Sequence, residues 1–237
     1  MSALPNAFDA TLPGTSNDAW LRVLEEKAAW IPRTESLVIV SAHPGEETLG
    51  AAGLMASFRH WRRPVTVISV SDGEAAYREW GGLGELRHVE MLSALHRLCP
   101  QGVTVIRLKL PDGQIQRHEA AVRESLFAQV PANALLVAPF EGEGHPDHQA
   151  LGRICLDAAA TLEVRTARYP IWAWHQEQAQ GFAGARWGRF ELNERLREAK
   201  RLAINALGSQ LRPPSGRPIV PPHCLAYFER PFEAFLL

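Results

Sequence analysis

The chain has 237 residues, of which 46% are hydrophobic and 22% are charged, and its formal net charge is −1. This composition is typical of a globular protein with one large core, so a single domain over residues 1–237 is the simplest expectation. A net charge close to zero gives no electrostatic reason to expect nucleic acid or an anionic membrane as a partner. We expect a small molecule as the partner, and the sequence leaves the oligomeric state open.

No targeting or membrane-spanning segment is expected. Residues 1–16 lack the basic start and apolar stretch of a signal peptide, and no window approaches the roughly 18 apolar residues of a membrane span. The three cysteines, Cys99, Cys155 and Cys224, lie within apolar segments and without the spacing of a CxxC-type site. They are therefore predicted to be reduced packing residues, with neither a disulfide nor a metal role, in a cytoplasmic protein.

Apolar runs alternate with segments of helical spacing between residues 35 and 169. In chain order we expect strands at 35–42, 65–71, 103–109, 134–139 and 163–169, and helices at 46–61, 84–98, 117–130 and 147–160. Strands that are apolar throughout and separated by helices are typical of a parallel sheet buried on both faces. The sequence therefore predicts an α/β fold: a Rossmann-like, doubly wound, mainly parallel sheet flanked by helices.

Further elements are expected at both ends of the chain. Residues 1–34 are read as a helical extension with a helix at 20–30, residues 35–170 as the α/β core, and residues 171–237 as a C-terminal region. That region is expected to contain a loop at 176–190, an amphipathic helix at 191–207, an exposed loop with five prolines at 211–222, and a last strand at 223–229.

Two histidine–acid clusters, residues 43–47 and 144–148, each directly follow a predicted strand. Sheets of this kind bind ligands beyond the carboxyl ends of their strands, where both clusters would meet. Taken singly, each has a purely structural reading: Glu46 and Glu47 favour a helix N-terminus, and Asp147 caps another helix. Together they supply the His and carboxylate ligands of a catalytic zinc site, so we predict a metal centre.

Other polar residues are ambiguous from the sequence alone. Asp72 and Asp112 also follow strands, but each precedes glycine and fits an ordinary turn. Arg87 and Glu90 are spaced like an exposed ion pair on a helix, which contributes little stability. The aromatic group that includes Trp174 fits either a packed face or a surface that stacks on a sugar ring.

These segments together resemble the PIG-L/LmbE-like zinc-dependent N-deacetylases, which remove acetyl from N-acetylglucosamine in lipid, thiol and antibiotic precursors. The family signature is Ala-His-Pro-Asp-Asp-Glu after the first strand and His-Pro-Asp-His after a later one. Here they stand as Ala-His-Pro-Gly-Glu-Glu at 42–47 and His-Pro-Asp-His at 145–148, within a likeness that covers about residues 35–230. Further matches are residues 71–74, Arg87 with Glu90, residues 111–113, Lys200 with Ser209 and Gln210, and the subset-specific segment 169–175.

The resemblance implies a role for each matched residue. The ligands of Zn²⁺, or of another divalent ion, would be His43, Glu46 and His148, with Glu46 in place of the family's aspartate. His145, oriented by Asp147, would stabilise the oxyanion or assist the leaving amine. The residues implied to contact substrate are Arg87, Asp112 and Trp174.

One position departs from the family pattern. Gly45 stands where the family has the aspartate that acts as general base towards the attacking water, and glycine cannot accept a proton. Loss of a general base typically costs 10²- to 10⁴-fold in rate, about 3 to 5 kcal/mol of barrier. Glu46, Glu47 or His145 would have to replace it.

The sequence therefore leaves two hypotheses about function. One is a working hydrolase that removes acetyl from the nitrogen of an acetylated amino sugar or glycoconjugate. The other is a catalytically silent relative that binds a sugar or a partner through the same pocket. A nucleotide-binding protein is disfavoured because no Gly-x-Gly-x-x-Gly or P-loop motif follows a strand, and a serine hydrolase because no Gly-x-Ser-x-Gly motif is present.

Overall fold

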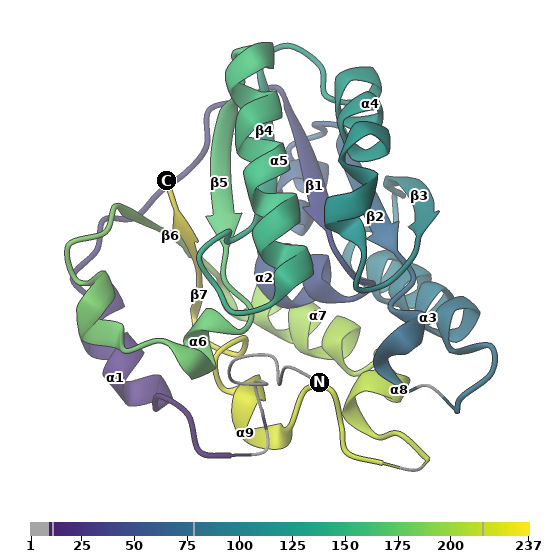
Figure 1. Ribbon diagram of the computed structural model, residues 1–237. Helices are drawn as coiled ribbons and strands as arrows, with labels where there is room; N and C mark the ends of the chain where they lie inside the picture. Colours follow the sequence, from purple (N-terminus) through teal and green to yellow (C-terminus); the bar gives the residue numbers. More distant parts are fainter. Residues whose placement is uncertain (1–9, 11, 78, 215) are drawn as a thin grey trace.

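A seven-stranded sheet forms the centre of the computed structural model, which describes residues 10, 12–77, 79–214 and 216–237 (Figure 1). The strand order is β3-β2-β1-β4-β5-β7-β6. The strands are β1 (Ser36–Ser41), β2 (Val65–Ser71), β3 (Thr104–Leu110), β4 (Ala134–Pro139), β5 (Arg165–Tyr169), β6 (Trp187–Glu191) and β7 (Phe232–Leu236). The first five pair in parallel, and β7 and β6 add an antiparallel edge, which confirms the predicted single, mainly parallel α/β domain.

Helices cover both faces of this sheet (Figure 1). One layer contains α2 (Glu46–His60), α3 (Leu83–Leu98) and α7 (Glu194–Ile204), and the other contains α4 (Glu119–Gln129) and α5 (Pro146–Leu162). In β1, Leu37 and Ile39 belong to the core beneath the first layer, and Val38 and Val40 to the core beneath the second. Burial on both faces explains why residues 37–40 of β1 are apolar at every position.

Shorter helices lie mainly in the connections. They are α1 (Asn17–Leu24), η1 (Glu74–Ala76), η2 (Ile115–His118), α6 (Ala173–Gln176), η3 (Ala179–Phe182), α8 (Gly208–Leu211) and α9 (Pro222–Leu225). Within the described part of the chain, no helix combines the length and apolar character needed to cross a membrane.

Three expectations for the chain ends were wrong. The expected loop at 176–190 contains β6, whose partner β7 is supplied from the end of the chain. The expected strand at 223–229 is instead helix α9 and turns, because the prolines at its start set a helical entry, and the last strand is 232–236. The expected helix at 20–30 ends at Leu24, since residue 29 already bridges to β6.

Candidate active site

The two histidine–acid clusters meet at the carboxyl ends of β1 and β4, which are paired in parallel. His43 follows β1, and Glu46 is the first residue of α2. His148 lies in the first turn of α5, which begins at Pro146 seven residues after β4 ends. Gly45, the residue before α2, has φ of 103°, and this left-handed conformation turns the chain sharply enough to bring Glu46 back beside His43.

Glu46 lies between the two histidines. Its Oε1 accepts hydrogen bonds from His43 Nδ1 and His148 Nε2, both at 2.7 Å. Its Oε2 accepts from the backbone N–H groups of Ala42 and His43, at 3.0 and 3.2 Å. One ligand atom from each of His43, Glu46 and His148 lies within 4.8 Å of the others, and all three residues are buried.

In this cluster, burial and the neighbouring charges act in opposite directions on each ionisable group. Burial opposes charge on Glu46, but His148 and His43 outweigh it and hold the Glu46 pKa well below its ordinary value. Burial likewise opposes charge on His148, yet Glu46 and Glu143 raise its pKa to about 9. The site therefore concentrates two imidazoles and a carboxylate in a small desolvated volume, which is the donor set that Zn²⁺ prefers.

Glu143 supports this cluster from behind and was missed by sequence reasoning. Its Oε1 accepts a short hydrogen bond from His148 Nδ1, and its Oε2 accepts from the backbone N–H groups of Ile171, Trp172 and Ala173, each at 2.9 Å. Its side chain is fully buried. A carboxylate on Nδ1 fixes the ring so that Nε2 faces the other ligands, as outer partners of metal-binding histidines do.

The contact between Asp147 and His145 is made by the backbone of Asp147, and the Asp147 carboxylate has other partners. The Asp147 carboxylate accepts from the backbone N–H groups of Gly113 and Ile115, at 2.8 and 3.1 Å, and lies 3.4 Å from His43 Nε2. The bond between the two residues runs from the Asp147 backbone N–H to His145 Nδ1, at 3.3 Å. The acceptor role of Nδ1 assigns the proton of a neutral His145 to Nε2, and burial together with His148 and His43 lowers its pKa to about 3.

Glu47 is sequestered beneath the cluster. Its carboxylate accepts hydrogen bonds from the Gly45 backbone N–H at 2.9 Å and from the Thr48 hydroxyl at 2.8 Å, and the residue has no exposed surface. Burial raises the pKa of Glu47 to about 7. Because Glu47 does not line the adjoining cavity, it is poorly placed to reach a substrate.

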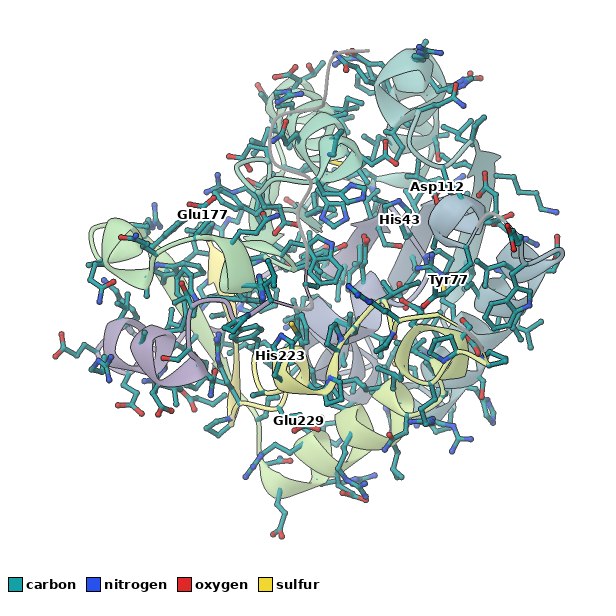
Figure 2. The ribbon with its side chains drawn as sticks, turned by 60° about the horizontal axis from the view of Figure 1, so that its bottom comes forward. His43, Tyr77, Asp112, Glu177, His223 and Glu229 are labelled. Atoms are coloured by element: carbon teal, nitrogen blue, oxygen red, sulfur yellow. The ribbon has the colours of Figure 1, made fainter. Side chains whose placement is uncertain are left out.

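A cavity of about 290 Å³ opens above the cluster. Its lining includes His43, Glu46, Arg87, Asp112 and His145 from the predicted site, and Trp172, Gln210, Ile219 and Val220 from the C-terminal region. Asp112 lies on the same side of the molecule as His43 (Figure 2), with its Oδ1 2.8 Å from His43 Nε2 and its Oδ2 accepting from the Ala75 N–H at 3.0 Å. A larger cavity of about 480 Å³ lies elsewhere and contains none of these groups, so the chemistry points to the smaller one.

Two predicted substrate-binding residues are engaged in other contacts. Arg87 lines the cavity, but its guanidinium donates to the backbone oxygens of Gly73 and Pro44 and to Gln210 Oε1, at 2.8, 3.2 and 3.2 Å. Trp174 does not line the cavity. It packs in the core against Trp20, with ring centroids 4.9 Å apart, and Trp172 is the aromatic residue at the cavity wall.

Comparison with known proteins gives a family and a fold. The family profile described as "PIG-L: GlcNAc-PI de-N-acetylase" matches residues 38–159. No curated protein matches the sequence.

Several solved structures share the fold. An antimicrobial-reagent pseudoaglycone deacetylase is 19% identical with a TM-score of 0.63, over 86% of this chain and 96% of that one. N,N'-diacetylchitobiose deacetylase from Pyrococcus horikoshii is 18% identical with a TM-score of 0.59, over 82% and 78%. The 4-carboxy-2-hydroxymuconate hydratase from Pseudomonas putida is 13% identical with a TM-score of 0.56, over 85% and 94%.

Proposed function

This chain belongs to the PIG-L family, and from that premise we propose that it is a zinc-dependent hydrolase that removes acetyl from the nitrogen of an amino sugar or glycoconjugate. The observation that carries the proposal is the convergence of His43, Glu46 and His148 on one point, with His43 and Glu46 in the lining of a cavity. The deacetylases among the structural neighbours are consistent with this reaction class.

The donor set fits a divalent ion. His43, Glu46 and His148 would hold it, and Glu143 would fix the His148 ring from its far side. When bound, such an ion supplies Lewis-acid polarisation of the amide carbonyl and lowers the pKa of water.

His145 is assigned to the developing oxyanion. It lines the cavity, and its Nδ1 accepts a hydrogen bond from the backbone, so its Nε2–H can donate to the carbonyl oxygen as negative charge builds there. The Asp147 carboxylate has an indirect role. It accepts hydrogen bonds from the backbone of Gly113 and Ile115, and it therefore positions the neighbouring Asp112.

Asp112 is assigned as the general base that accepts a proton from the attacking water, a role that Gly45 cannot fill. Unlike Glu47, it lines the cavity, and its Oδ1 lies 2.8 Å from His43 Nε2. In the reaction the water oxygen bonds to the acetyl carbon, and its proton passes to Asp112. The carbon–nitrogen bond then breaks, the amine nitrogen takes up this proton from Asp112, and acetate and the free amine leave.

The test is acetate release from a panel of N-acetylglucosaminides by the zinc-loaded protein. We expect wild type to turn over and Asp112→Asn to lose about 10²- to 10⁴-fold in kcat. Asp72→Asn is the matched control, since Asp72 also follows a strand but pairs with Arg107 outside the cavity lining. Equal activity of Asp112→Asn and wild type would reject Asp112 as the base.

A second pair of variants distinguishes a weakened enzyme from a silent relative. Gly45→Asp restores the family's carboxylate, and Gly45→Asn has the same size and backbone strain without a proton acceptor. If only Gly45→Asp releases acetate, the wild-type protein is a silent relative with an otherwise complete site. If Gly45→Asp folds like wild type and neither protein releases acetate from the panel, deacetylation of N-acetylglucosaminides is rejected. The hydratase among the neighbours indicates that this fold also supports other chemistry.

A further inference from the structure

We propose that His175, His223 and Cys224 form a second metal site that binds Zn²⁺, separate from the histidine–glutamate cluster. One ligand atom from each residue lies within 4.8 Å of the others. His175 comes from α6, and His223 and Cys224 come from α9. None of the three lines the candidate active-site cavity.

The spacing suits a tetrahedral ion. Zinc–nitrogen distances of about 2.0–2.1 Å and zinc–sulfur distances of about 2.3 Å place neighbouring ligand atoms roughly 3.5 Å apart. The His175 and His223 rings have centroids 5.8 Å apart, so only a small inward movement is needed. His223 can supply it, because its side chain is exposed whereas Cys224 and His175 are held in the interior.

The surroundings of His175 have the form expected around a metal-binding histidine. His175 Nε2 donates to the backbone oxygen of Leu12 at 2.7 Å. Histidines that bind zinc commonly donate their second ring N–H to a carbonyl or carboxylate, which fixes the orientation of the ring. A thiolate with two imidazoles is a borderline-soft donor set, which favours zinc over magnesium or calcium.

The position of the site suggests what a bound ion would do. His175 follows Ile171 and Trp172, and His223 and Cys224 follow Ile219 and Val220; both of these preceding pairs line the active-site cavity. Figure 2 shows His223 on α9, apart from His43 and Asp112. An ion held by α6 and α9 would therefore cross-link the two segments that continue into the cavity wall, and the His175–Leu12 hydrogen bond would also connect it to the chain before α1.

Sequence spacing alone could not reveal this site. The only adjacent pair is His223 and Cys224, and the third ligand comes from a separate helix. The sequence accordingly predicted a packing role for Cys224. Burial of Cys224 agrees with packing, but packing alone does not require two imidazoles beside the thiol.

The test uses the full-length protein stripped of metal and reloaded with Zn²⁺ or Co²⁺. We expect His223→Ala and Cys224→Ser each to bind one ion fewer per chain than wild type. We also expect wild type to show thiolate-to-cobalt absorption in the near ultraviolet and both variants to lose it. His148→Ala should keep this absorption, because it removes a ligand of the other cluster only.

The matched control is His96→Ala, since His96 is also exposed but belongs to no metal-ligating group among the described residues. It should bind as many ions as wild type. His223→Ala keeps the test valid if Cys224→Ser folds poorly, because His223 is at the surface. Absence of the thiolate absorption from wild type, or its persistence in Cys224→Ser, would overturn the proposal whatever the fate of the deacetylase activity.

Discussion

The side-chain amide of Gln210 lies where a side chain on Gly45 would begin. A Cβ added to Gly45 would come within 2.7 Å of Gln210 Nε2. Gln210 is fixed there, because its Nε2 donates to the Pro44 oxygen at 2.9 Å and its Oε1 accepts from Arg87 at 3.2 Å. The φ of 103° at position 45 also favours glycine. Gln210 therefore fills the space that an aspartate side chain would need at this position.

Replacing Gly45 should therefore cost stability through both the backbone and this contact. We expect Gly45→Ala to lower the free energy of unfolding by about 1–3 kcal/mol, measured by urea denaturation. Gly102→Ala is the control for backbone strain alone, since Gly102 has φ of 82° but nothing within 4 Å of its added Cβ. Equal losses for the two variants would show that Gln210 yields without cost.

Removing Glu143 should weaken metal binding without touching a metal ligand. Its carboxylate joins His148 Nδ1 to three backbone N–H groups. An amide in its place cannot accept at both oxygen positions, so we expect Glu143→Gln to lower zinc affinity by about 10- to 100-fold. Competition against a chelator measures this affinity. The control Glu141→Gln, whose partner is Arg168, should bind zinc like wild type.

β1, β2 and β4 were predictable because they are buried on both faces and consist mainly of apolar residues. β3 and β5 are partly exposed and contain arginine or lysine, and they were predictable from their alternation with helices. The antiparallel edge formed by β6 and β7 was not predictable in this way. In β6, Gly188 and Arg189 interrupt the apolar pattern, and the pairing partner of β6 is more than forty residues away. In β7, Glu233 is a buried charge, which no local pattern distinguishes from a surface residue.

The two motif clusters were likewise visible in the sequence, whereas their supporting residues were not. Glu143 lies five residues before His148, and its sequence context is that of an ordinary acidic residue in a loop. Its contacts with the three N–H groups of segment 171–173 exist only in the folded protein. The choice between Trp172 and Trp174 as the aromatic wall depends on the turn at α6, which the alternating sequence does not specify.

The buried thiol of Cys99 should make stability fall at alkaline pH. Burial raises its pKa from about 9 to about 12. The folded state therefore favours the neutral thiol, and this contribution is fully present below about pH 9 and lost as pH rises towards 12. Between about pH 8.5 and 10.5, wild type should lose about 1–2 kcal/mol more unfolding free energy than Cys99→Ala. Parallel pH profiles in the two proteins would contradict this.

The stability of the protein should depend on a buried ion pair beside the kink in helix α2, the helix that contains Glu46. Its backbone leaves helical geometry at Ala51, and the Glu233 carboxylate accepts from the N–H groups of Gly53 and Leu54 at 2.8 and 2.9 Å. Lys200 Nζ lies 2.8 Å from Glu233 Oε1, with both side chains buried. Lys200→Met would leave the Glu233 charge without its partner in the interior, so we expect a loss of about 3–5 kcal/mol in unfolding free energy.

The neighbouring ion pair on α7 provides the control for this last prediction. Arg201 pairs with Glu198 at 2.6 Å, but both side chains are about half exposed. Because exposed pairs contribute about 0–1 kcal/mol, Arg201→Met should unfold in urea close to the wild-type midpoint. A loss from Lys200→Met no larger than the loss from Arg201→Met would mean that Glu233 takes up a proton or reaches water when Lys200 is removed. In that case the carboxylate alone would be sufficient to cap the broken helix.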